Sequence, residues 1–174
     1  MKKVFGLLML TAALLVFRMP QAEAGYVQIF DRNVMTLAGK MSGLLIALKD
    51  DTCRMSVPEN MGRFRPDSPY INYIASVGPK GSAVVVVFYC NEDGSVSKAN
   101  LMFDPKNSAA VRCAKKAGAA MLFAMGLERD YITQLMLMRV DTDSVWSEML
   151  DRRIIVDFIL QREMVNMRIL AADE

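Results

Sequence analysis

The fold of this chain is decided by residues 83–103, which read AVVVVFYC at 83–90, NEDG at 91–94 and SVSKANLMF at 95–103. The first segment is β-branched, aromatic or otherwise apolar throughout, a composition that favours strands. In the last segment the apolar residues Ala99, Leu101 and Phe103 alternate with the polar residues Lys98 and Asn100, the period of a strand with one buried face. The pattern predicts a β-hairpin over 83–103. Its first strand, apolar on both faces, is expected to lie centrally in a sheet.

The C-terminal segment predicts two more strands at about 152–170. Its apolar residues alternate with polar ones at Ile154, Val156, Phe158 and Leu160, and again at Val165, Met167 and Ile169. No Gly or Pro marks residues 161–163, so the connection is either a tight turn or a bulge in one long strand. Residues 142–150, which contain the only Trp, are expected to form a short helix before these strands.

Apolar residues at helical spacing mark three further segments. Over residues 31–49 they recur every three or four positions, with Asp31 as the expected N-cap. A second helix is expected after residues 104–105 and up to about residue 125, with Ala and Gly on its inner face, and a third over residues 128–139.

Residues 50–82 form a long connection rich in Pro and Gly. Within it, Ser56 with Glu59 fits a capping box, and residues 68–79 carry the start and stop signals of a two-turn helix. Together these elements predict an α+β domain. We expect an antiparallel sheet of about four strands, with helices packed on one face.

Residues 1–24 have the features of a cleavable secretory signal peptide. A basic start at Lys2 and Lys3 precedes an apolar run, and Ala22-Glu23-Ala24 supplies the small residues that a signal peptidase requires. The apolar run is shorter than the roughly 20 residues that span a bilayer. We therefore expect residues 25–174 to be exported as a single domain without a transmembrane segment. The periplasm is the expected compartment, and secretion from the cell is the alternative.

The composition excludes several classes of function. The chain has no histidine, so the usual general base at neutral pH and the commonest zinc ligand are absent. Removal of residues 1–24 reduces the 21 basic and 19 acidic residues to 18 of each, and a neutral domain does not favour nucleic-acid binding. Residues 78–82 (GPKGS) precede a strand instead of a helix, which argues against a phosphate-binding loop. The sequence indicates no metal and no cofactor.

The chain has three cysteines, and the compartment to which it is expected to be exported oxidises thiols. This favours one disulfide and one remaining thiol. We expect Cys53 to pair with Cys90, because Cys113 belongs to a helix that starts at the far end of the hairpin, and to leave Cys113 buried. The other pairings stay open. A reactive thiol is the alternative to a structural disulfide.

Carboxylate pairs and methionines offer weaker candidates for chemistry. Asp50-Asp51, Glu92-Asp93 and Asp141-Thr142-Asp143 could serve a glycosidase-type site, but acidic residues at element boundaries usually cap backbone N–H groups. The 15 methionines could bind Cu(I), although most of them occupy faces expected to be buried, where Met fills the core.

The best candidate for a binding surface lies in the connection between residues 55 and 80. It contains aromatic and arginine side chains, the residue types that anchor interfaces: Arg63, Phe64, Arg65, Tyr70 and Tyr73. The sequence therefore favours an exported, non-catalytic cell-envelope protein that binds another protein or a small ligand. The alternative is a periplasmic enzyme that uses thiol redox chemistry or carboxylates.

Overall fold

The computed structural model describes residues 29–127, 129, 132–133, 145–149, 152–161 and 163–171. Its elements are β1 (Phe30–Asn33), α2 (Val34–Ala47), a 3-10 turn η1 (Asp51–Cys53), β2 (Glu59–Gly62), β3 (Ile71–Val77), β4 (Val84–Cys90), β5 (Ser95–Phe103), α3 (Ser108–Ala124), β6 (Val145–Met149), β7 (Arg152–Gln161) and β8 (Met164–Ala171). The predicted signal peptide lies outside these residues, as does most of the helix predicted over 128–139.

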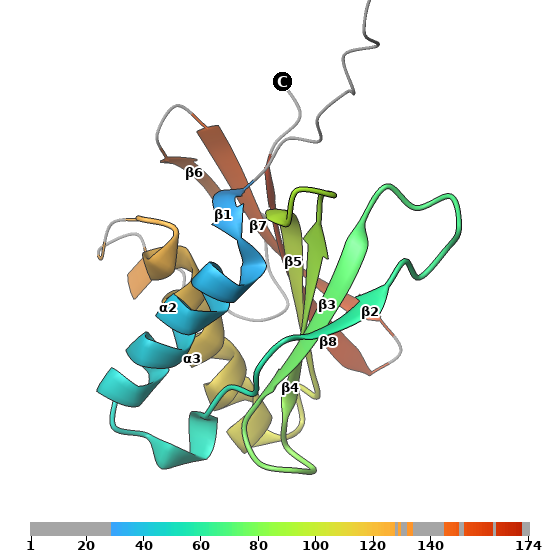
Figure 1. The fold of residues 1–174 in the computed structure, drawn as a ribbon. Helices are drawn as coiled ribbons and strands as arrows, with labels where there is room; N and C mark the ends of the chain where they lie inside the picture. The colour runs from blue at the N-terminus through green and yellow to red at the C-terminus, as the bar shows by residue number, and fades with distance from the viewer. Residues whose placement is uncertain are drawn as a thin grey trace, which may run out of the picture.

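The described strands form one antiparallel sheet of eight strands in the order β2-β3-β4-β5-β8-β7-β6, with β1 pairing to β5. Helices α2 and α3 lie side by side on one side of this sheet (Figure 1). The α+β class and the packing of the helices on one face are thereby confirmed. The sheet is larger than the four strands expected, because β1, β2, β3 and β6 add to the predicted ones.

The predicted hairpin is β4–β5, and the apolar β4 occupies the centre of the sheet between β3 and β5. Val86 pairs with Leu101 and Phe88 with Ala99, and all four side chains are buried in the core beneath the helices. The predicted C-terminal strands are β7 and β8. Gln161 pairs with Met164 across their connection, so this connection is the tight turn.

Four local predictions are wrong. The helix indicated by the capping box of Ser56 and Glu59 does not form, because Glu59 begins strand β2 and the Ser56 hydroxyl accepts the Ser76 N–H. Residues 68–79 do not form a helix, because Ile71–Val77 pairs along its whole length with β4 as strand β3. The backbone N–H and C=O groups on both edges of β4 need hydrogen-bond partners. Strand β5 provides them on one edge and β3 on the other. The helix predicted over 142–150 is replaced by strand β6, which pairs with β7. The N-cap of α2 is Asn33 and not Asp31, because the Asn33 side chain accepts the Met35 N–H.

Helix α3 packs closely on the sheet because its inner face is small. Ala110, Ala114, Ala117 and Gly118 are all buried. A Cβ placed on Gly118 would lie 2.7 Å from Cε of Met167 on β8, so a larger residue here would require the flexible end of the Met167 side chain to move. The small residues predicted for the inner face of this helix therefore set the distance between helix and sheet.

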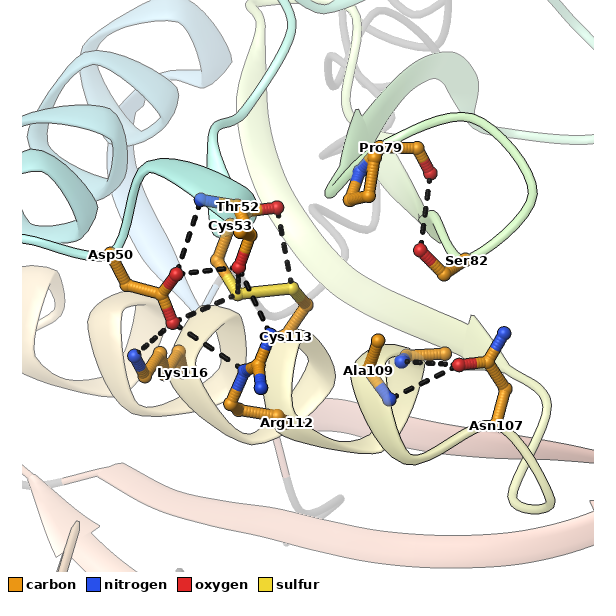
Figure 2. Close-up of a disulfide and its surroundings, with 11 residues drawn as sticks. Asp50, Thr52, Cys53, Pro79, Ser82, Asn107, Ala109, Arg112, Cys113 and Lys116 are labelled. Carbon is orange, nitrogen blue, oxygen red and sulfur yellow. Dashed lines mark hydrogen bonds and ion pairs between the residues drawn. A yellow bond between two sulfur atoms is a disulfide. The ribbon is translucent and has the colours of Figure 1, made fainter.

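The predicted disulfide was wrong in one partner: Cys53 pairs with Cys113, and Cys90 is a free, buried thiol. The η1 turn follows α2 and places Cys53 against α3, with 5.2 Å between the two Cα atoms (Figure 2). Cys90 lies instead at the end of β4, with its side chain in the core. Cys90 and Cys113 are not paired, as predicted from their separation along the hairpin. The sequence did not predict that η1 places Cys53 against α3.

The disulfide closes a loop of 60 residues and restricts the unfolded chain accordingly. We predict that Cys53→Ala/Cys113→Ala lowers the free energy of unfolding by about 4 kcal/mol in the loop-entropy account. Urea denaturation of the oxidised protein measures this loss. The control is Cys90→Ala, which removes a sulfur without opening a loop and should cost about 1 kcal/mol. Equal losses in the two variants would contradict the assigned pairing.

Candidate functional site

A cleft of about 510 Å³ opens between the 63–70 loop, which connects β2 to β3, and the face of the sheet opposite the helices. The floor comes from one row across three strands, because Asn72 of β3 pairs with Tyr89 of β4, and Tyr89 pairs with Lys98 of β5. These side chains alternate with the core residues of their strands and therefore point away from the helices. The loop contributes the remaining lining residues, which are Phe64, Arg65, Asp67, Ser68, Pro69 and Tyr70.

Lys98 lies at the centre of an aromatic cluster on this floor. Its ammonium is 4.3 Å from the ring centre of Tyr89 and 5.0 Å from that of Tyr70, within the range of cation–π attraction. The two rings meet edge to face, with 5.9 Å between their centres. Burial lowers the pKa of Lys98, and the nearby Arg168 guanidinium lowers it further. The cleft therefore holds a partly desolvated positive charge.

Asn72 adds an unpaired hydrogen-bond acceptor to the floor of the cleft. Its side chain is only 1% exposed, and Nδ2 donates to the Gly62 carbonyl at 2.9 Å, which fixes the end of β2. Its Oδ1 has no hydrogen-bond partner within the part of the chain that the structure describes. This oxygen is itself buried, so it belongs to the floor of the cleft without being open to a bound molecule.

The five residues predicted for partner binding divide into three groups. Phe64, Arg65 and Tyr70 line the cleft. Arg63 instead braces the loop, since it donates to the Ser68 carbonyl and pairs with Glu92 at 2.5 Å. Tyr73 lies on the core face of β3, and its hydroxyl accepts from Asn60.

Sequence reasoning missed Asn72, Tyr89 and Lys98, which form the floor of the cleft. The alternation in the hairpin did place Lys98 on the polar face of its strand. That signal did not identify which neighbouring strands lie beside it. The register of β3 on β4 and of β4 on β5 brings the three residues into one row.

The cysteines offer little for thiol chemistry. Cys90 is fully buried, and burial followed by the charge of Asp93 raises the pKa of its thiol to about 12. The thiolate that would act as nucleophile is therefore scarce at neutral pH. The disulfide is also buried, with Cys53 at 1% and Cys113 at 0% exposure.

Asp50 is held by a polar cluster beside this disulfide (Figure 2). Its carboxylate accepts from Lys116 and from the Thr52 hydroxyl and N–H, lies 3.5 Å from Nε of Arg112, and is 3.6 Å from Sγ of Cys53. The Lys116 hydrogen bond and then those from Thr52 hold the pKa of Asp50 far below its usual range. This cluster fastens η1 to α3.

The other predicted carboxylate pairs also have structural partners where they are described. Asp51 pairs with the exposed Arg54, Glu92 with Arg63, and Asp93 accepts from Ser95. Residues 141–143 lie outside the described residues. No group of three His, Cys, Asp or Glu side chains that could hold a metal ion occurs among the residues described.

Comparison with known proteins gives no match: no protein-family model fits the chain, and no curated protein or solved structure is significantly similar to it. Among the residues that the structure describes, no helix has the length and apolar character needed to cross a membrane.

We predict that Asp50→Asn destabilises the protein at pH 7 and that this difference shrinks as the pH falls below about 4, the pKa of an unperturbed Asp. A carboxylate whose pKa is lowered by folding stabilises the folded state above its unfolded pKa, and this contribution is lost on acidification. Urea unfolding at pH 7, 5, 4 and 3 measures the difference. Asp51→Asn is the matched control, because its ion pair is exposed and should contribute little at any pH. A pH-independent effect at Asp50 would contradict the assignment.

Proposed function

We propose that this protein is exported to the cell envelope and acts there without catalysis, by binding another protein or a small ligand in the cleft. The observation that carries the proposal is the position of Lys98, held over Tyr70 and Tyr89 at the floor of an open cleft. Ligand sites typically have volumes of about 300–1,000 Å³ and combine aromatic walls with a few polar groups. The cleft has this volume and this composition.

The exposed rim of the cleft supports the same proposal. Phe64 projects from the 63–70 loop with 52% of its surface exposed, next to Arg65. Aromatic and arginine side chains contribute most of the binding energy at many interfaces. The loop that presents them is fastened by Arg63, so the rim is held in place before a partner arrives.

The redox and carboxylate alternatives have less support. A catalytic thiol requires exposure and a lowered pKa, whereas Cys90 is buried and its pKa is raised. The described acidic residues of the predicted pairs form ion pairs or turn hydrogen bonds, and none of them lines the cleft.

A site-specific cross-link tests the proposal. A photoreactive phenylalanine analogue at position 64 should capture a partner in the intact envelope, or contact a small ligand that native mass spectrometry finds on the purified protein. The matched control is position 123, because Phe123 is also 52% exposed but lies on α3, on the other side of the sheet. Capture at both positions, or at position 123 alone, would contradict a role for the cleft. A role for the cleft would also be contradicted if position 64 captured no partner and native mass spectrometry found no bound ligand.

The same preparations test export. We predict that the envelope fraction contains a chain that starts at Gly25, because cleavage should follow Ala24. Intact-mass measurement distinguishes this chain from the full-length precursor. As a control, replacing Ala22 and Ala24 by Gln should block cleavage and leave the precursor mass. A full-length chain confined to the cytoplasm would contradict the proposed compartment.

A further inference from the structure

We propose that the cleft recognises an organic anion, in which an acidic group contacts Lys98 and Arg65 and an attached planar group packs among Phe64, Tyr70 and Tyr89. This inference rests on the proposed binding function and specifies its ligand class. Two sources share this chemistry. One is a small aromatic acid, and the other is the terminal carboxylate of a protein that ends in an aromatic residue.

Among the described residues, carboxylates neutralise the cations that surround the cleft but not the two that line it. Arg63 is neutralised by Glu92, and Arg168, the cation next to Lys98 on the same face, is held by both carboxylate oxygens of Asp157. Lys98 and Arg65 have no ion pair with any described carboxylate. The two cations that line the cleft are therefore the ones available to an incoming anion.

The residues that line the cleft have a net positive charge, which also favours an anionic ligand. Arg65 and Lys98 contribute two positive charges, and Asp67 contributes the one carboxylate among the residues that line the cleft. Lys98 is half-buried, and the rings of Tyr70 and Tyr89 replace part of the hydration shell of its ammonium. An anion gains more from a partly desolvated ammonium than from an exposed one, because the local dielectric constant is lower. The site thus favours negative charge over neutral ligands.

The remaining features describe the rest of the ligand. Tyr70 and Tyr89 meet edge to face, and Phe64 stands exposed at the rim, so a flat apolar group would find ring surfaces on more than one side. A carboxylate and an aromatic ring occur together in an N-acylated aromatic amino acid.

The test uses two probes that differ in one group, a charged carboxylate in one and a neutral carboxamide in the other. The folded mature chain, ¹⁵N-labelled, is titrated with N-acetylphenylalanine and separately with its neutral amide, N-acetylphenylalaninamide. We expect the acid to shift the amide resonances of the 63–70 loop and of Asn72, Tyr89 and Lys98. The amide should bind about tenfold or more weakly, a difference that corresponds to one ionic hydrogen bond.

Variants separate charge from packing. Lys98→Met keeps the length of the side chain and should weaken the acid about tenfold while leaving the amide unchanged. Lys98→Arg keeps the charge and should retain most of the affinity. Lys106→Met is the control, because Lys106 is exposed, pairs with Glu163 and lies outside the cleft. An unperturbed spectrum outside the cleft verifies that each variant is folded.

The inference is overturned if the amide binds as tightly as the acid, or if Lys98→Met binds the acid like the wild type.

Failure of the anion assignment can be told apart from failure of the binding function. If position 64 still captures a partner while neither probe discriminates by charge, only the anion assignment is wrong. If N-acetylphenylalanine added before irradiation prevents the cross-link of a protein to position 64, a protein terminus is the source. A bound acid found by native mass spectrometry would indicate a small molecule.

Discussion

Burial of strand β4 is the constraint on which the rest of the structure depends. Five consecutive apolar residues, from Val84 to Phe88, leave this strand no polar face to turn toward water. Its backbone groups need partners on both edges, which β3 and β5 provide. The helices cover the side that carries Val86 and Phe88. On the opposite side Val87 is only 3% exposed, so this face of the sheet is partly enclosed as well.

The cleft follows from the way that second face is organised. Tyr89 continues the outward-pointing row of β4, and antiparallel register places Asn72 and Lys98 directly beside it. The 63–70 loop, fastened through Arg63 to Glu92 in the β4–β5 turn, stands over this row and leaves a hollow. On the helical side the Cys53–Cys113 disulfide and the Asp50–Lys116 pair fasten η1 to α3. The helical side thus has a covalent link that stabilises the fold, and the opposite side has an open cleft.

Sequence periodicity was sufficient where a pattern is local. The β4–β5 hairpin, the C-terminal strands and the two long helices each carry their own signal over seven or more residues. Strand β3 was missed because Pro69 and the Gly78-Pro79 pair resemble helix boundaries, while its pairing with β4 depends on a partner elsewhere in the chain. Composition identified Phe64, Arg65 and Tyr70, but Lys98 became a candidate only through the register of three strands. The disulfide depended on how η1 docks against α3, which no local pattern encodes.

A ¹³C NMR titration of the lysine side chains measures whether Lys98 is held over two tyrosine rings in a partly desolvated cleft. The Lys98 side-chain protons next to the ammonium should resonate upfield of those of other lysines, because they lie over the faces of Tyr70 and Tyr89. The pKa of Lys98 should fall below the pKa values of the exposed lysines, and Tyr89→Leu should remove most of the upfield shift. A Lys98 signal with the chemical shift and pKa of an exposed lysine would contradict the account.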